Sequence, residues 1–140
     1  MTQQTTIQQI LDARVGHAVV TTKADVHIRD AAQRMHAHGI GCLLVTGDRD
    51  DVVGIVTERD CLRHLALADE AECGATPVEA LMSRKVIAVS SEHTVPQALA
   101  VMHERRLRHL PVLQDKRILG LVSQRDLARA LVDDQRATIE

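Results

Sequence analysis

The sequence predicts an α/β (α+β) fold made of two copies of one strand-helix-strand-strand-helix unit. The first observation is an internal duplication, in which Met35-His36 is matched by Met102-His103 and Gly54 to Asp60 by Gly120 to Asp126. The second is that apolar residues change period in the same order within each copy, from short strand-like runs to helical spacing. The third is composition: 45% of the residues are hydrophobic, which is typical of a folded chain.

The first copy is expected to hold five elements in the order strand, helix, strand, strand, helix. These lie at Val19-Val20, Ile28 to Met35, Cys42 to Val45, Val52 to Val56, and from Thr57 onward. Apolar residues at i, i+3, i+4 and i+7 predict the first helix. Gly39 is expected to end that helix, and Gly47 to Asp50 form the turn between the second and third strands.

The second copy repeats these elements in the same order. They are expected at Val86-Ile87, Val95 to Met102, Leu110 to Leu113, Ile118 to Val122, and from Arg125 onward. The resulting organisation is a helical lead-in (1–14), a first repeat (15–65), a connector (66–77), a second repeat (78–132) and a tail (133–140). The strands are apolar almost throughout, which favours small sheets covered on both faces.

A hydroxyl residue followed three residues later by Asp stands at a strand-to-helix junction in both copies. These pairs are Thr57 with Asp60 and Ser123 with Asp126. One interpretation is a capping box that stabilises each helix start. The other is a ligand site, because free N–H groups at a helix start suit a phosphate and a carboxylate suits ribose hydroxyls. Local sequence leaves both interpretations open.

Three motifs, by their order and spacing in the chain and by the duplication of the first, resemble the CBS-domain pair, the tandem module named after cystathionine β-synthase. They are Gly54 to Asp60 with its copy Gly120 to Asp126, then Arg108-His109-Leu110-Pro111-Val112, and Val78-Glu79-Ala80-Leu81-Met82-Ser83 leading into Val86-Ile87-Ala88-Val89. The resemblance covers about Ile7 to Val132. It implies β-α-β-β-α CBS repeats packed as a pseudo-twofold pair, with two adenosyl-ligand clefts between the repeats.

The resemblance also implies which residues would form each cleft. One cleft would join Thr57, Arg59 and Asp60 to the backbone of Val86 and Ile87. The other would join Ser123, Arg125 and Asp126 to Val19 and Val20. The central region would be lined by Arg108, His109 and Pro111, with the first two near phosphate.

The first repeat departs from the family pattern beside its motif. Gly41-Cys42-Leu43-Leu44 stands where the second repeat has Arg108-His109-Leu110-Pro111, so a basic pair and a proline are missing. The two clefts are therefore expected to be unequal, with one weak or empty.

Composition excludes several other classes of protein. With no Trp, Tyr or Phe, the chain has no aromatic platform for single-stranded nucleic acid, and a net charge of −2 forecasts no bulk attraction to a polyanion. Cys61-x-x-His64 lacks the second ligand pair of a zinc site, so no metal is expected. No catalytic order of nucleophile and base stands out, so the protein is not expected to be an enzyme. Reduced cysteines and the lack of a signal-peptide or membrane-helix pattern predict a cytoplasmic protein.

The expected function is regulatory sensing of an adenine nucleotide, AMP or ATP, with no required cofactor. Without aromatic rings, adenine would lie between aliphatic side chains such as Val20 or Ile87. The family commonly pairs its helices face to face, which implies a homodimer that signals to an unidentified protein target. Two alternatives stay open: a ligand-free interaction module whose motifs are only helix caps, and a binder of another adenosyl compound, S-adenosylmethionine or NAD.

Overall fold

The computed structural model describes residues 4–13 and 19–139; the expected start of the first repeat, residue 15, lies outside these ranges. The described chain divides into two compact units. The repeat-1 unit comprises residues 20–86, and the repeat-2 unit comprises residues 4–13, 19 and 87–139. The predicted class of fold is confirmed: each unit combines helices with a small sheet.

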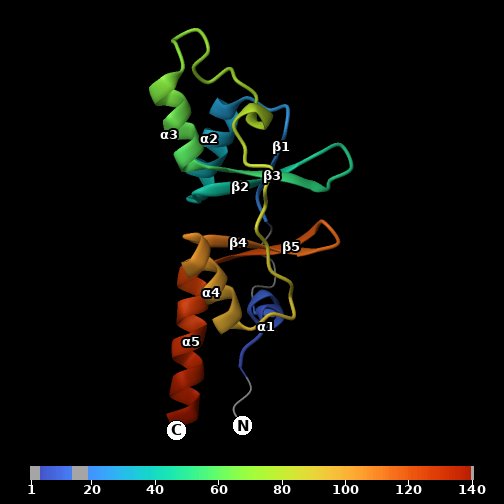
Figure 1. The fold of residues 1–140 in the computed structure, drawn as a ribbon, viewed down its shortest axis with the longest axis vertical. Helices are drawn as coiled ribbons and strands as arrows, with labels where there is room; N and C mark the ends of the chain where they lie inside the picture. The colour runs from blue at the N-terminus through green and yellow to red at the C-terminus, as the bar shows by residue number, and fades with distance from the viewer. Residues whose placement is uncertain (1–3, 14–18, 140) are drawn as a thin grey trace. The chain divides into compact units, whose positions relative to one another are not determined.

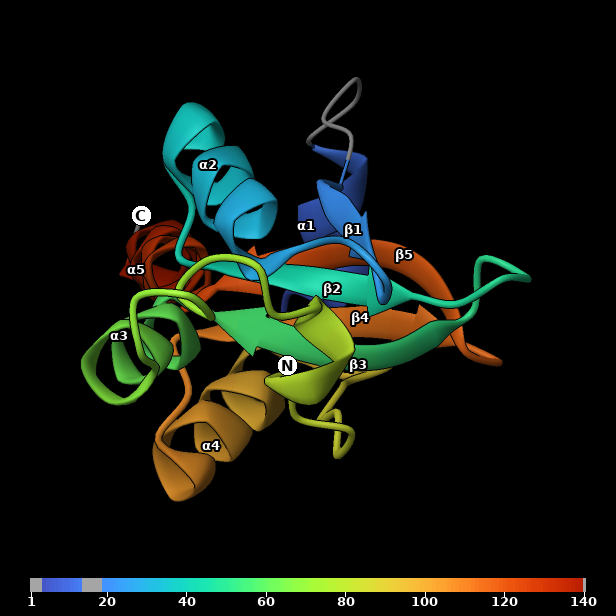
Figure 2. The same ribbon diagram turned by 90° about the horizontal axis from the view of Figure 1, so that it is seen from above.

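The repeat-1 unit contains a three-stranded sheet in the order β1-β2-β3. Its elements are β1 (Thr21–Lys23), α2 (Ile28–His38), β2 (Cys42–Thr46), β3 (Val52–Thr57), α3 (Glu58–Leu67) and the short 3₁₀ helix η1 (Val78–Ala80). β1 and β2 are parallel, as the intervening helix requires, whereas β2 and β3 form an antiparallel hairpin. Helices α2 and α3 lie on the same face of this sheet (Figures 1 and 2).

The repeat-2 unit is built around the β4–β5 hairpin, which corresponds to β2 and β3 of the other unit. Its elements are α1 (Ile7–Asp12), α4 (Val95–Arg105), β4 (His109–Gln114), β5 (Arg117–Ser123) and α5 (Gln124–Ile139). Val89 makes a single parallel bridge to Val112. The corresponding pair in the other unit, Thr22 and Val45, belongs to the parallel ladder of β1 and β2. Helices α1, α4 and α5 lie on one face of the hairpin (Figure 1).

The first strand of each repeat begins later than the sequence predicted. The strand expected at Val19-Val20 is β1 at Thr21–Lys23, and Val86-Ile87 precedes the bridge at Val89 without belonging to a strand. The apolar pairs misled the prediction because Val20 and Ile87 pack against the cores of their units from outside the ladder. These apolar side chains pack against the core of their unit. Hydrogen-bonded pairing of the backbone with the next strand starts one residue after Val20 and two residues after Ile87.

Each unit has its own hydrophobic core, and both cores draw on the same positions of the repeat. The duplicated pairs Met35 and Met102, and Val56 and Val122, are 4% exposed or less. The predicted helix end at Gly39 is present, with φ at 63°, a left-handed conformation that glycine adopts without strain.

The segment that precedes each repeat packs against the other repeat's core. Ile7, at the start of α1, is fully buried among residues of the repeat-2 unit, and Val78 is fully buried among those of the repeat-1 unit. The backbone bonds correspond: Ile7 N–H donates to His93 at 2.8 Å, and Val78 N–H donates to Val26 at 2.8 Å. The lead-in helix α1 and the 3₁₀ helix η1 at the start of the second repeat are therefore equivalent elements exchanged between the repeats.

This exchange explains the glycine at the start of each duplicated motif. A Cβ on Gly54 would lie 2.5 Å from Met82 Sδ and 2.9 Å from the backbone oxygen of Ser83. A Cβ on Gly120 would overlap Leu11 in the same way. Only glycine leaves room for the incoming segment to pass against β3 in one unit and β5 in the other.

Candidate functional site

The motif of the repeat-1 unit forms a complete capping box at the start of α3. Thr57 Oγ1 accepts the Asp60 N–H at 3.3 Å, and Asp60 Oδ2 accepts the Thr57 N–H at 2.8 Å. The Thr57 hydroxyl also donates to Asp60 Oδ2 at 3.1 Å. Both side chains are half-buried, and Arg59 between them is exposed. The cap interpretation is therefore correct as far as local structure goes.

The motif of the repeat-2 unit has the same geometry at the start of α5. Ser123 Oγ accepts the Asp126 N–H at 3.1 Å, and Asp126 Oδ2 accepts the Ser123 N–H at 3.1 Å and the Ser123 hydroxyl at 2.6 Å. Arg125 is exposed, like Arg59. In both motifs these cap bonds fall on one carboxylate oxygen, Oδ2. The cap therefore orients each aspartate at the start of its helix.

In the repeat-2 unit the structure brings the predicted basic pair to the motif. The backbone oxygen of Arg108 accepts the Gln124 N–H at 2.8 Å, at the first residue of α5. His109 is the register partner of Ser123 across the β4–β5 ladder. Arg108 is exposed and His109 is half-buried. Pro111 is buried farther along β4, and its oxygen accepts the Val89 N–H at 3.0 Å.

The corresponding corner of the repeat-1 unit has the same backbone but different side chains. The oxygen of Gly41 accepts the Glu58 N–H at 2.9 Å, and Cys42 is the register partner of Thr57. The carboxylate of Glu58 lies against Gly41, since a Cβ there would be 3.2 Å from Oε1 and 3.3 Å from Cδ. Sequence reasoning did not select Glu58, although its replacement by Gln124 in the second copy was a visible signal.

The buried thiol of Cys42 shows the electrostatic character of this corner. Burial, and to a smaller extent the Glu58 carboxylate, raises the pKa of Cys42 to about 11. Cys42 therefore remains a neutral thiol at physiological pH. It behaves as a small core residue and offers no nucleophile or metal ligand.

The segments expected to contact adenine occupy corresponding places in the two units. Val20 and Ile87 are half-buried against their own cores, and Val19 and Val86 are half-buried beside them. In the repeat-1 unit, Ser83 and Ile55 exchange two backbone hydrogen bonds of 2.9 Å. The chain that leads to Val86 therefore leaves from the middle of β3, the strand that ends at Thr57. How the residues of one unit meet those of the other stays a prediction.

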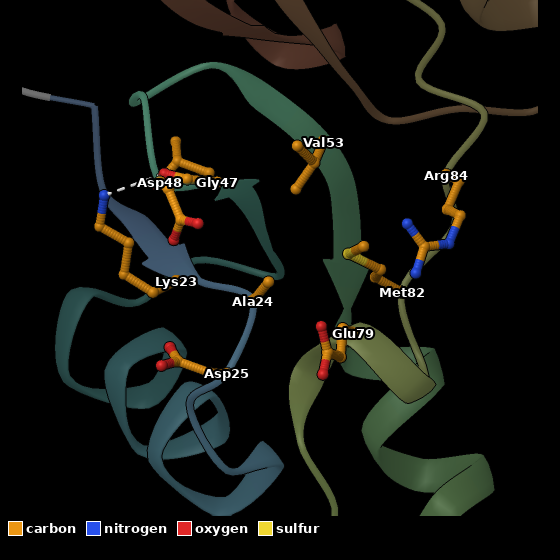
Figure 3. Close-up of a pocket in the computed structure, with 10 residues that line it drawn as sticks. Lys23, Ala24, Asp25, Gly47, Asp48, Val53, Glu79, Met82 and Arg84 are labelled. Carbon is orange, nitrogen blue, oxygen red and sulfur yellow. Dashed lines mark hydrogen bonds between the residues drawn. The ribbon is translucent and has the colours of Figure 1, made fainter.

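A separate cavity of about 470 Å³ lies in the repeat-1 unit, at the opposite end of β3 from the motif. Figure 3 shows Lys23 and Arg84 on opposite sides of it, with Met82 between Val53 and Glu79. The described residues that line it include none of the predicted site residues. Its Lys23 is already engaged, because Nζ lies 2.6 Å from Asp50 Oδ1. The described charged residues that line this cavity include both signs, and no capping box lies among them, so the cavity differs from the two motif sites.

Two searches of the described residues returned negative findings. Residues 4–13 and 19–139 contain no group of three or more His, Cys, Asp or Glu side chains placed to hold a metal ion. In the same part of the chain, no helix has both the length and the apolar character needed to cross a membrane.

Comparison with known proteins identifies the class. A family model described as CBS domain matches residues 7–67 and again residues 78–133. The chain therefore belongs to the CBS-domain family and contains a tandem pair of its repeats, as the sequence motifs predicted. Such pairs are ligand-sensing regulatory modules and generally have no catalytic activity of their own.

Individual relatives agree with this assignment. The chain is 39% identical over 116 residues to an uncharacterized 17.7 kDa protein of Acidianus ambivalens, covering 82% of this chain and 68% of that one. It is similar to the structure of a putative signal-transduction protein with CBS domains from Burkholderia ambifaria, with 41% identity, a TM-score of 0.82, and 94% and 96% of the two chains covered. The CBS domain pair of protein MJ0100, in complex with 5′-methylthioadenosine and S-adenosyl-L-methionine, shares the fold at 24% identity, with a TM-score of 0.79 and 94% and 98% covered.

Proposed function

We propose that this protein is a regulatory sensor that binds an adenine nucleotide, AMP or ATP, and passes the signal on by rearranging its repeats or a dimer. The observation that carries the proposal is the hydroxyl–aspartate pair held at the start of α3 and of α5. A sensor needs no further chemistry, because a change in the relative stability of two arrangements is enough to transmit binding. In this proposal the protein acts by binding without catalysis, and it signals to a separate protein target.

The proposed contacts follow from the geometry of each motif. The aspartate accepts hydrogen bonds from ribose hydroxyls, because its cap bonds already fix the carboxylate in place. The ribose 5′ substituent lies at the helix start, where backbone N–H groups and the helix dipole favour negative charge. Adenine contacts Val86 and Ile87 in one cleft and Val19 and Val20 in the other, between aliphatic side chains. Arg59 or Arg125, with Arg108 and His109, neutralises the phosphate.

Ligand-dependent stabilisation tests this proposal most directly. The midpoint of thermal unfolding, followed by circular dichroism, should rise when AMP or ATP is added. The free energy of unfolding should increase by about 2.7 kcal/mol for each site at a ligand concentration of 100 times Kd. Asp60→Ala and Asp126→Ala should each remove one binding event in calorimetric titration. Thr94→Ala is the matched control, because Thr94 and Gln97 form an equivalent capping box on α4 outside the motifs. That variant should lose stability and keep both binding events.

Two alternatives predict different results in the same experiment. The complete capping boxes favour a ligand-free interaction module, which would show no shift with AMP, ADP or ATP at millimolar concentration. The fold shared with MJ0100 favours another adenosyl ligand, and S-adenosylmethionine or NAD would then shift the unfolding midpoint where AMP and ATP do not. If Asp60→Ala and Asp126→Ala both leave binding unchanged, the ribose assignment is wrong.

We also propose that two copies associate through α3. This helix has no buried residue, and Leu62, Leu65 and Leu67 are 66%, 62% and 80% exposed. Exposed leucines in this number on one ten-residue helix indicate a surface that is covered in an assembly. A second copy supplies an identical apolar surface, which is self-complementary around a twofold axis.

Sedimentation velocity tests the association. The double change Leu62→Glu and Leu65→Glu places like charges across the proposed interface and should convert a dimer into a monomer. Far-ultraviolet circular dichroism should stay unchanged, because neither side chain contributes to the core. Arg63→Glu, at an exposed position between them, is the charge control. A wild-type protein that sediments as a monomer at high concentration would refute the interface.

A further inference from the structure

The two motif corners differ most at the first residue of the helix that follows each cap. Glu58 begins α3 and Gln124 begins α5. Each donates its N–H to the backbone oxygen of the residue before the first hairpin strand, Gly41 before β2 and Arg108 before β4. The backbone geometry is thus the same in both repeats. The side chains differ by one full negative charge at the place where the proposed 5′ substituent lies.

Glu58 is exposed, and its carboxylate lies close to the backbone of its corner. Its Oε1 and Oε2 lie 3.2 and 3.6 Å from the point where a Cβ on Gly41 would be. The second repeat carries Arg108 where the first has Gly41. The Cβ of Arg108 therefore occupies the place that, in the first repeat, is 3.2 Å from Glu58 Oε1. A cation in one repeat is therefore replaced by an anion in the other, which doubles the difference in charge.

Counting the charged residues of each corner gives opposite signs. The repeat-1 corner has Glu58, Asp60 and Arg59, a net charge of −1, and the repeat-2 corner has Asp126, Arg108 and Arg125, a net charge of +1. Arg63 and its counterpart Arg129 are present in both copies. Asp133, Asp134 and Arg136 occur only in α5, nine or more residues beyond its first residue, and are not part of the corner. The raised pKa of Cys42, to which Glu58 contributes, agrees with a negative field in the repeat-1 corner.

We infer that Glu58 is a specificity-determining residue, which makes the Thr57–Asp60 site bind 5′-phosphorylated ligands more weakly than an adenosyl compound whose 5′ substituent is neutral or cationic. The inference rests on the proposed function and concerns only which ligand each motif takes. A phosphate next to Glu58 would face a like charge, and the corner of its own repeat has Gly41 and Cys42 where the second repeat has Arg108 and His109. A sulfonium or an uncharged group meets no such repulsion. The Ser123–Asp126 site is then the stronger nucleotide site.

The test uses the full chain with Asp126→Ala, which isolates the Thr57–Asp60 site. Calorimetric titration with adenosine, AMP and S-adenosylmethionine should give weaker binding of AMP than of the other two. Adding Glu58→Gln should strengthen AMP binding about threefold to fivefold, the size of a partly exposed charge interaction. Adenosine should bind unchanged, and S-adenosylmethionine should bind about twofold to threefold more weakly.

The reciprocal change is the matched control. In an Asp60→Ala chain, Gln124→Glu should weaken AMP about threefold to fivefold and leave adenosine unchanged. Both effects should shrink as salt is raised, which separates an electrostatic cause from a steric one.

The outcomes also separate this inference from the proposed function. If no adenosyl compound binds the unmodified chain, the proposed function fails and the inference fails with it. If adenosine and AMP bind through Asp60 while Glu58→Gln leaves their ratio unchanged, the sensor survives and the role of Glu58 is refuted.

Discussion

The helices that follow the two motifs, α3 and α5, occupy equivalent places in the repeat but are anchored very differently. Leu127 of α5 is fully buried in the core of the repeat-2 unit, whereas the corresponding residue of α3 is Cys61, which is only half-buried. Leu131 packs against its core, and its counterpart Leu65 is 62% exposed. A duplicated pattern of residues has therefore produced one docked helix and one that lies largely on the surface.

Contacts outside the duplicated segment explain part of this difference. α5 is six residues longer than α3, since their lengths are 16 and 10 residues. The added length includes Asp134, which accepts the backbone N–H of Thr5 at 3.2 Å and its hydroxyl at 2.5 Å. The two motifs therefore stand at the start of helices that are packed against their cores to different extents. The Thr57–Asp60 motif lies on the less anchored helix, the one whose leucines are available to a partner.

Removing the anchor of α5 should have the largest effect. Leu127→Ala deletes a fully buried side chain and should cost about 2–5 kcal/mol in the free energy of unfolding. Cys61→Ala at the matching position of α3 should cost about 1 kcal/mol or less, because little surface is buried there. Urea unfolding followed by circular dichroism measures both. Equal losses would show that α3 is docked as firmly as α5.

The motif glycines should give the next largest effect. Gly54→Ala forces a Cβ against Met82 and the rigid backbone oxygen of Ser83, and should cost about 1–3 kcal/mol through overpacking. Gly120→Ala meets only side-chain atoms of Leu11, which can move, and should cost less. Unfolding midpoints of the two variants should rank in that order. A reversed ranking would mean that α1 is held more tightly than the segment that contains Met82 and Ser83.

The smallest effect concerns pH and Cys42, which has no titrating thiol as its counterpart in the second repeat. Its pKa is about 11 in the folded protein against 9.0 for an ordinary thiol, so the unfolded chain loses the proton first. Stability should be complete below pH 9 and fall as the pH rises toward 11, by about 1 kcal/mol over the first pH unit. Cys42→Ala should flatten this slope, relative to the wild type, in urea titrations at pH 8 and pH 10. An unchanged slope would assign the alkaline loss to other groups.

Much of this fold could be predicted because the sequence contains two copies of the same unit. The order of elements, the capping pairs and the Gly39 helix end follow from period, turn residues and repetition. The first strands were misplaced because Val20 and Ile87 are apolar for packing reasons, and a period of two cannot be read from so short a run. Glu58 was overlooked because a lone glutamate after a cap has no distinctive pattern. Its importance comes from Gly41, seventeen positions away, which the fold brings against it.

The sequence by itself determined the repeated α+β architecture, the family and the two hydroxyl–aspartate motifs, since these depend on local spacing and on duplication. Only the tertiary structure decided that each lead-in segment packs on the other repeat, that the motif glycines make room for it, and that α5 is anchored while α3 is exposed. Those features depend on which residues distant in the chain share a surface. No local periodicity encodes such contacts, because the free energy that selects them comes from burial across the whole unit.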